Sequence, residues 1–111
     1  MAVAQFKVWI HKKTGEAVVK PPLDTASINN GKFQLTNKTT KDIIVKVPAL
    51  FGTGSAPDPE TVTTVKPGNA NRLELLVHST TTEGVYSFPV FCLETFSFAK
   101  ANSDPEIIIE N

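Results

Sequence analysis

Apolar side chains recur at every second position through most of this sequence. The segments that show this spacing are 6–10, 33–35, 43–47, 73–77 and 86–92. Successive side chains of a strand point to opposite faces, so a period of two predicts strands with one buried face. No segment keeps a period of 3.6 residues between helix caps. The chain is therefore expected to be all-β.

Turn-forming residues divide these strands at intervals of about 8–12 residues, a spacing typical of β-sandwiches. The strongest turn signal is Asn29-Asn30-Gly31, because Asn and Gly tolerate a positive φ. We predict one domain over residues 1–111, folded as an antiparallel Greek-key β-sandwich of seven or eight strands. A short helix is allowed at 22–28 or at 93–100. Two glycines and two prolines predict a long loop at 50–60.

The charge balance bears on the class of partner. Lys plus Arg number 11 and Asp plus Glu also number 11. Binding to nucleic acid normally rests on a basic excess, and membrane binding on a polybasic segment or an apolar run of ~20 residues. We therefore expect neither partner, and another protein is the partner that remains open. The first ten residues alternate rather than forming a signal-peptide core, so the cytoplasm is the default location. Secretion after removal of a leader and the oligomeric state both stay open.

The candidate site residues are few. Cys92 is the only cysteine, which excludes an intrachain disulfide, and the two histidines are His11 and His78. A thiolate with one or two imidazoles is a donor set for zinc or copper, so Cys92 with His78 or His11 forms the candidate metal site. At the end of an aromatic-rich strand, however, a free cysteine usually behaves as a small buried hydrophobe. We interpret Cys92 in that way and predict no catalytic residue, no metal and no cofactor.

Four aromatic residues have an open role. Trp9 lies on the polar face of its strand. We interpret it as part of a second core layer, and the alternative is a contact residue on an exposed surface. Phe91, Phe96 and Phe98 flank Cys92, and we interpret them as core and loop anchors rather than as a binding platform.

The C-terminal half resembles the cupredoxin family. The residues that carry the resemblance are Val65-Lys66-Pro67-Gly68, the strand 72–78, and Gly84-Val85-Tyr86-Ser87-Phe88 running on to Cys92. In that family the cysteine binds copper together with two histidines and a methionine. Here Lys41 and Asp42 stand where the first histidine is expected, and residues 93–98 contain neither histidine nor methionine. The resemblance therefore implies a cupredoxin-like sandwich without the copper centre, and an immunoglobulin-like strand order remains the alternative.

Three functional hypotheses follow. The first is a non-catalytic binding or structural module that acts through the loop at 50–60 or through a sheet edge, as sandwiches often do. The second is a metal-binding or redox protein with a non-standard Cys/His site. The third is an enzyme whose site is built from ordinary Ser, Asp, Thr or Lys residues. The first is the prediction, because no nucleophile elbow, metal motif or phosphate loop accompanies the candidate residues.

Overall fold

The structure is a computed structural model that describes residues 3–100 and 104–111. Within these residues there is no α-helix, and a single turn of 3-10 helix, η1, spans Asn69–Asn71. The strands are β1 (Val3–Ile10), β2 (Ala17–Lys20), β3 (Leu23–Ser27), β4 (Lys32–Asn37), β5 (Ile43–Val47), β6 (Thr61–Val65), β7 (Leu73–Leu76), β8 (Gly84–Ser87), β9 (Val90–Cys92), β10 (Ser97–Phe98) and β11 (Glu106–Glu110). The prediction of an all-β chain is confirmed.

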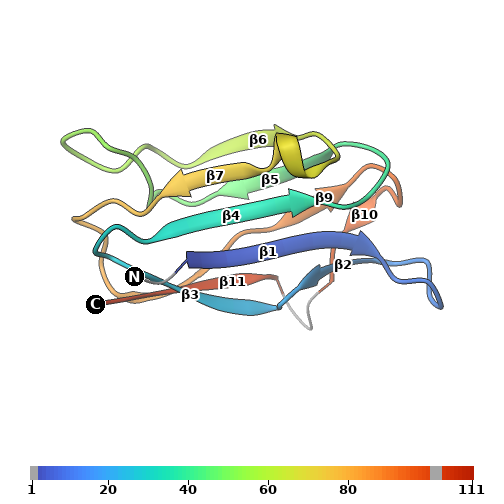
Figure 1. Cartoon of the computed structure of the whole chain (residues 1–111), viewed down its shortest axis with the longest axis horizontal. Helices are drawn as coiled ribbons and strands as arrows, with labels where there is room; N and C mark the ends of the chain where they lie inside the picture. Colours follow the sequence, from blue (N-terminus) through green and yellow to red (C-terminus); the bar gives the residue numbers. More distant parts are fainter. Residues whose placement is uncertain (1–2, 101–103) are drawn as a thin grey trace.

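The strands form three sheets. Sheet A has the order β2-β1-β4-β7, sheet B the order β3-β11-β8, and sheet C the order β10-β9-β5-β6. Figure 1 shows sheet A in front of sheet C, with β3 and β11 of sheet B below β1. Packed sheets around a shared core are consistent with a β-sandwich.

Two strand pairs depart from the antiparallel arrangement that the sequence predicts. β1 pairs with β4 in parallel, from Val3 opposite Lys32 to Val8 opposite Asn37. β11 also pairs with β3 in parallel. The prediction of a wholly antiparallel sandwich is therefore wrong at these two pairs. A period of two identifies a strand and its buried face but carries no information on the direction of its neighbour.

The structure contains more strands than the seven or eight that were predicted. β3 occupies the segment 23–27, where a short helix was allowed, because pairing with the apolar strand β11 places Ala26 in the core. The other allowed helix, at 93–100, is also absent, since this segment forms the turn after β9 and the two-residue strand β10. The third additional strand arises because the single strand predicted around the segment 86–92 is divided into β8 and β9.

That division carries the chain from one sheet to another. β8 pairs with β11 in sheet B, and β9 pairs with β5 in sheet C. Between them, the backbone N–H of Phe88 donates to the Pro105 carbonyl at 2.9 Å, and the Pro89 carbonyl accepts from Lys46 N–H at 3.0 Å. Pro89 has no N–H of its own and suits a position where one ladder ends and the next begins.

The turn after β3 confirms the strongest turn signal of the sequence. Asn30 has a φ of 62°, in the left-handed region that Asn tolerates. Gly31 follows, and a Cβ atom at this position would lie 2.0 Å from the Ser27 carbonyl oxygen. No other residue fits so close to the backbone of β3, so the Asn-Gly pair sets where β4 starts.

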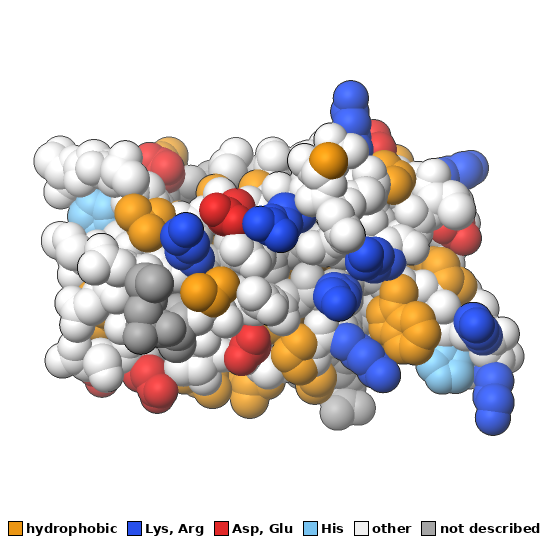
Figure 2. Space-filling view, in the orientation of Figure 1, with side chains coloured by type: hydrophobic (Ala, Val, Ile, Leu, Met, Phe, Trp, Pro, Cys, Tyr) orange, Lys and Arg blue, Asp and Glu red, His pale blue; other side chains and the backbone are white. Residues whose placement is uncertain are grey.

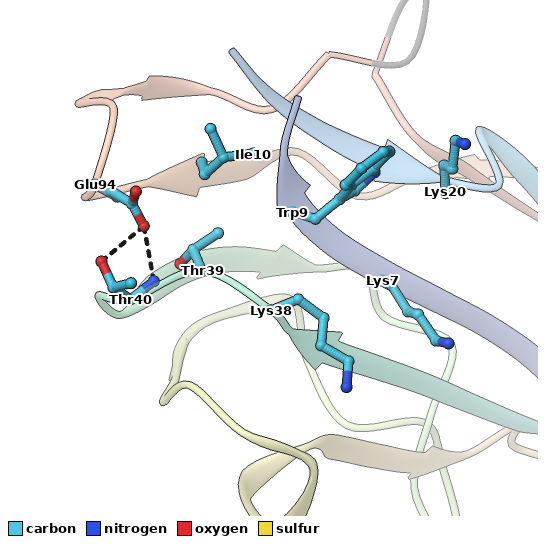
Figure 3. A pocket seen from close by; sticks show the side chains of 8 residues that line it. All are labelled: Lys7, Trp9, Ile10, Lys20, Lys38, Thr39, Thr40 and Glu94. Atoms are coloured by element: carbon cyan, nitrogen blue, oxygen red, sulfur yellow. Dashed lines mark hydrogen bonds between the residues drawn. The ribbon is translucent and has the colours of Figure 1, made fainter. Parts of the chain in front are cut away.

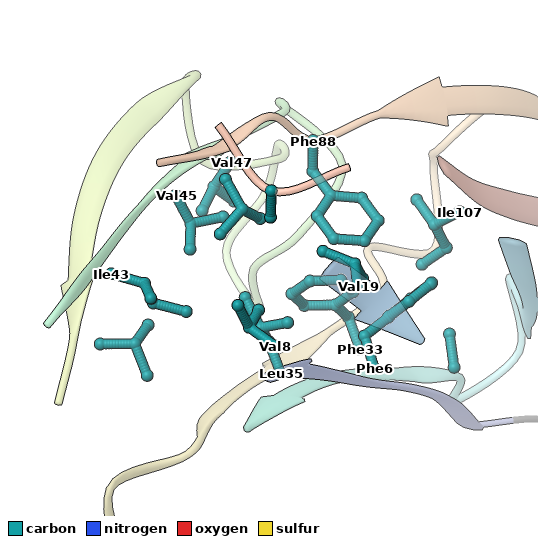
Figure 4. Packing of buried hydrophobic residues seen from close by; sticks show 14 of the residues in the cluster. Phe6, Val8, Val19, Phe33, Leu35, Ile43, Val45, Val47, Phe88 and Ile107 are labelled. Carbon is teal, nitrogen blue, oxygen red and sulfur yellow. The ribbon is translucent and has the colours of Figure 1, made fainter. Parts of the chain in front are cut away.

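The core lies between the inner faces of the sheets (Figure 4). Its centre is a group of three phenylalanines, Phe6 from β1, Phe33 from β4 and Phe88 from the segment between β8 and β9. Their ring centroids are 4.6–5.6 Å apart, with Phe88 packed edge-on against the other two. Aliphatic side chains surround them, including Leu35, Ile43, Val45, Val90 and Ile107, each with an exposed fraction of zero.

Candidate functional site

Cys92 lies in the hydrophobic core. Its exposed fraction is zero, and on β9 it sits opposite Ile43 on one side and Ser97 on the other. The thiol is free and buried among the residues of the central cluster. This environment agrees with the interpretation of Cys92 as a small hydrophobic residue.

His78 is also buried, with an exposed fraction of 4%, but both of its ring nitrogens are engaged. The Thr80 backbone N–H donates to Nδ1 at 3.1 Å, so the ring proton lies on Nε2, which donates to the Gly54 carbonyl at 2.9 Å. His78 thereby ties the loop at 50–60 to the end of β7. Leu50 and Phe51 anchor the start of this loop in the core.

His11 is half-buried in the turn after β1. Its Nδ1 accepts hydrogen bonds from the backbone N–H groups of Lys13 and Thr14, at 3.2 and 3.4 Å. In the part of the chain that the structure describes, no three His, Cys, Asp or Glu side chains are grouped so as to hold a metal ion. The two histidines and Cys92 each have a structural environment of their own.

A groove on the outer face of sheet A is the candidate site. It has a volume of ≈570 Å³, within the range of ligand pockets in general. Trp9 of β1 forms one wall, and Ile10 and the start of the β4–β5 connection face it (Figure 3). The residues that line the groove are Lys7, Trp9, Ile10, Lys20, Lys38, Thr39, Thr40 and Glu94. We call it the Trp9 groove.

Three lysines surround the Trp9 groove because of the pairing of their strands. Lys7 and Trp9 are on the same face of β1, and Lys20 of β2 is directly opposite Lys7. Lys38 directly follows β4, and its ammonium donates to Asn69 Oδ1 at 2.6 Å. In Figure 2 basic side chains gather around this region, although the whole chain has no net charge.

None of these three lysines has an acidic partner in an ion pair among the described residues. The ion pairs found within residues 3–100 and 104–111 involve Lys32, Lys46, Arg72 and Lys100 instead. The positive charge of three lysines that line one groove attracts an anion. The groove thus combines an apolar wall with a positive rim.

The indole of Trp9 is held in an unusual state. Lys20 Nζ lies 4.9 Å from the centroid of the ring, within the range of a cation–π contact. The indole Nε1–H is buried and has no hydrogen-bond acceptor among the described residues. A buried donor without an acceptor has a free-energy cost.

Glu94 lines the opposite side of the groove from the lysines. Its Oε1 accepts from the Thr40 backbone N–H at 2.7 Å and from the Thr40 hydroxyl at 2.8 Å. The backbone bond, followed by the hydroxyl bond, holds the pKa of Glu94 below its usual value, while desolvation acts in the opposite direction. The groove therefore has an ionised carboxylate at one side and ammonium groups at the other.

The sequence indicated Trp9 but not the groove. The indole lies half-buried on the outer face of sheet A, which agrees with the alternative of a surface contact residue rather than with the preferred second core layer. Lys7 and Trp9 are two positions apart, so their shared face was readable. Lys20, Lys38 and Glu94 reach the groove through strand pairing and loop contacts. The spacing of apolar residues does not encode such contacts.

The three C-terminal phenylalanines are placed differently from the prediction. Phe96 is 79% exposed and Phe98 is 59% exposed, so neither is a core anchor. Both rings contact Phe91 edge-on, with centroids 5.4 and 5.1 Å apart. They form an aromatic cluster on the outer face of sheet C.

No family model matches this chain, and no curated protein is significantly similar to it in sequence. In the described residues no helix has the length and apolar character needed to cross a bilayer.

Proposed function

We propose that this chain is a non-catalytic binding module and that the Trp9 groove binds an anionic group attached to a ring or another apolar moiety. The observation that carries the proposal is that Lys7, Lys20 and Lys38, none of them ion-paired in the described part of the chain, line the same groove as Trp9. Small-molecule sites typically combine an apolar lining with a few placed polar groups. The lysines supply the charge, and Trp9 supplies the apolar surface.

The reactive side chains have structural partners, which supports a binding role over a catalytic one. Cys92 is fully buried, and His78 has a hydrogen bond at each ring nitrogen. Glu94 directs one carboxylate oxygen to Thr40. These contacts favour neither the Cys/His metal or redox protein nor the enzyme with an unrecognised site.

The finer fold assignment belongs to the same proposal. The sandwich is a Greek-key, cupredoxin-like fold without a copper centre, and an immunoglobulin-like strand order is the alternative. The segment that carries the cupredoxin resemblance forms β7, β8 and β9, and its cysteine is part of the core. The partner that we expect is another protein, which presents the anionic group on one of its side chains.

Fluorescence provides a direct test because Trp9 is the only tryptophan. We would titrate the protein with phenyl phosphate, inorganic phosphate and phenol at low salt. Phenyl phosphate should change the emission of Trp9 at the lowest concentration, since it alone offers both the ring and the charge. Added salt should weaken its binding, as screening reduces attraction between exposed charges. Phenyl phosphate should also be recovered intact, and release of phenol would support the enzyme instead.

Matched variants locate the site. Lys7→Gln combined with Lys20→Gln should weaken the binding of phenyl phosphate roughly tenfold, equal to about 1.4 kcal/mol. The control is Lys32→Gln with Lys46→Gln, which removes the same charge away from the groove and should leave the affinity nearly unchanged. An equal loss in both double variants would contradict the proposal, as would binding of phenol as tight as that of phenyl phosphate. Tighter binding of a short phosphotyrosine peptide than of phenyl phosphate would point to a protein partner.

A further inference from the structure

β6 is an edge strand whose outward backbone groups have no backbone partner among the described residues. Of the described strands it pairs only with β5, which in turn pairs with β9. The Lys46 N–H donates to the Pro89 carbonyl, and the Leu93 N–H donates to the Asp42 carbonyl at 3.2 Å. The even-numbered residues in and next to β5 therefore direct their backbone groups to β9. The odd-numbered residues of β5 therefore bond to Thr61, Thr63 and Val65. The backbone N–H and C=O groups of Val62 and Thr64 therefore point away from β5, outward in the plane of the sheet.

The side chains of β6 do nothing to protect this edge. The strand Thr-Val-Thr-Thr-Val contains no charge and no proline, and the side chain of Val62 is 63% exposed. Natural sheets usually block a free edge with a charge, a proline, a bulge or a covering segment. A neutral strand of β-branched residues is the opposite of such protection.

Three other edges of the described sheets differ from β6 in cover or in length. The edge of β2 is covered by Lys100, whose backbone exchanges hydrogen bonds with Ala17 and Val19. The end of β7 is covered by Phe51 and Gly52, which bridge Val77 and Leu76. β10, the opposite edge of sheet C, is only two residues long. β6 therefore stands out as a five-residue edge of sheet C without cover.

Two charges of opposite sign flank this edge. Glu60 precedes β6 and Lys66 follows it, and both side chains are on the outer face of sheet C with Val62 and Thr64. Glu60 already contacts Lys46 on this face, with 3.6 Å between the carboxylate and the ammonium. Glu60 and Lys66 are the same number of residues from Thr63 along the sequence. When the segment 60–66 is placed antiparallel to a copy of itself about Thr63, each glutamate therefore lies opposite a lysine.

We propose that β6 pairs antiparallel with β6 of a second copy of this chain, about a two-fold axis at Thr63. In this register Val62 lies opposite Thr64 of the second copy, and the free backbone groups of both residues meet. Each such pair exchanges two backbone hydrogen bonds, and the symmetry repeats the pair. Glu60 then lies opposite Lys66 of the second copy on the same face, so two cross-strand ion pairs flank the ladder. Sheet C continues across the axis into its copy.

The backbone and the charges select this register. A shift of one residue would place the free groups of Val62 and Thr64 opposite groups that are already bonded to β5. A shift of two residues keeps the backbone bonding but removes the match between Glu60 and Lys66. One strand contributes a small contact compared with the ~1,600 Å² of a standard interface, so we expect a weak dimer that depends on protein concentration.

Sedimentation velocity of the full chain at low salt tests the proposal, over concentrations up to about 1 mM. The weight-average mass should rise from that of the monomer towards twice that value. Glu60→Lys alone and Lys66→Glu alone each replace two attractive pairs by two repulsive ones, and each should weaken dimerisation about tenfold or more. The double variant exchanges the two charges, so a lysine at position 60 again lies opposite a glutamate at position 66 of the second copy. Its dimer affinity should be within about threefold of the original.

A proline variant provides the second measurement. Val62→Pro removes an N–H group that points to solvent in the monomer, so the pairing with β5 survives while the dimer is lost. Circular dichroism and the emission of Trp9 check that the variant is folded. A monomer at every concentration would overturn the proposal. Failure of the double charge variant to recover the dimer would also overturn it, and so would a dimer that Val62→Pro leaves unchanged.

Discussion

Two clusters of phenylalanines in this small protein have similar separations between ring centroids but differ in exposure. Phe6, Phe33 and Phe88 pack in the core with centroids 4.6–5.6 Å apart. In the second group, Phe96 and Phe98 contact Phe91 at 5.4 and 5.1 Å, yet they are 79% and 59% exposed. Edge-to-face contact between rings therefore does not by itself identify a core.

What separates the two groups is the layer on the far side of each ring. The buried group is enclosed because two sheets meet on it, and Phe88 lies where the chain passes from sheet B to sheet C. The second group is on the outer face of sheet C, where no described element covers it. The stability of the fold should therefore respond very differently to the loss of a ring from each group.

Phe88→Ala should cause the largest loss of stability, about 3–5 kcal/mol in the free energy of unfolding. The ring is 1% exposed and contacts both other members of the core group, so its removal leaves a cavity. Urea unfolding followed by the emission of Trp9 gives the measurement. Phe98→Ala is the matched control on the second group, and it should cost less than about 1 kcal/mol. Equal losses for the two variants would show that the exposed rings also stabilise the fold.

Substitutions of Cys92 test how far the core extends along β9. Cys92→Ala should cost on the order of 1 kcal/mol, because a small buried side chain is shortened. Cys92→Ser should cost more, about 1–3 kcal/mol, if its hydroxyl is left without a partner in this apolar position. The native thiol should also react with a thiol reagent only after unfolding. Equal stability of the two variants, or fast reaction of the native thiol, would place Cys92 at the surface.

Much of this fold was predictable because burial on one face leaves a period of two in the sequence. Each of Phe33, Leu35, Ile43 and Val45 is buried as its strand pattern indicates. Strand direction and the division of residues 84–92 between two sheets were not predictable, since both depend on contacts between distant segments. Contacts between distant segments also decide which strands lie at a sheet edge and which side chains are exposed. For this reason Phe96 and Phe98 were assigned to the wrong environment.

The candidate site was less predictable than the fold. The sequence singled out Cys92, His78 and His11 for their chemistry, but each has a structural environment of its own. The Trp9 groove draws on β1, β2 and the connections after β4 and β9. Its lysines are ordinary surface residues in the sequence. They line one groove with Trp9 because β1 pairs with β2 and with β4.

The smallest effect concerns the backbone at Phe96, whose φ of 51° is in the left-handed region that glycine adopts without strain. Phe96→Gly and Phe96→Ala both remove the ring, but only the glycine relieves the strain. The glycine variant should therefore be more stable than the alanine variant by about 0.5–1 kcal/mol, since the strain of ~1–2 kcal/mol outweighs the greater flexibility of glycine in the unfolded chain. Ser97, in strand β10, is the control, and there alanine should be the more stable of the two. The same order of stability at both positions would mean that the turn relaxes without cost. The exposed aromatic cluster would then be held in place by ring contacts alone rather than by a strained backbone.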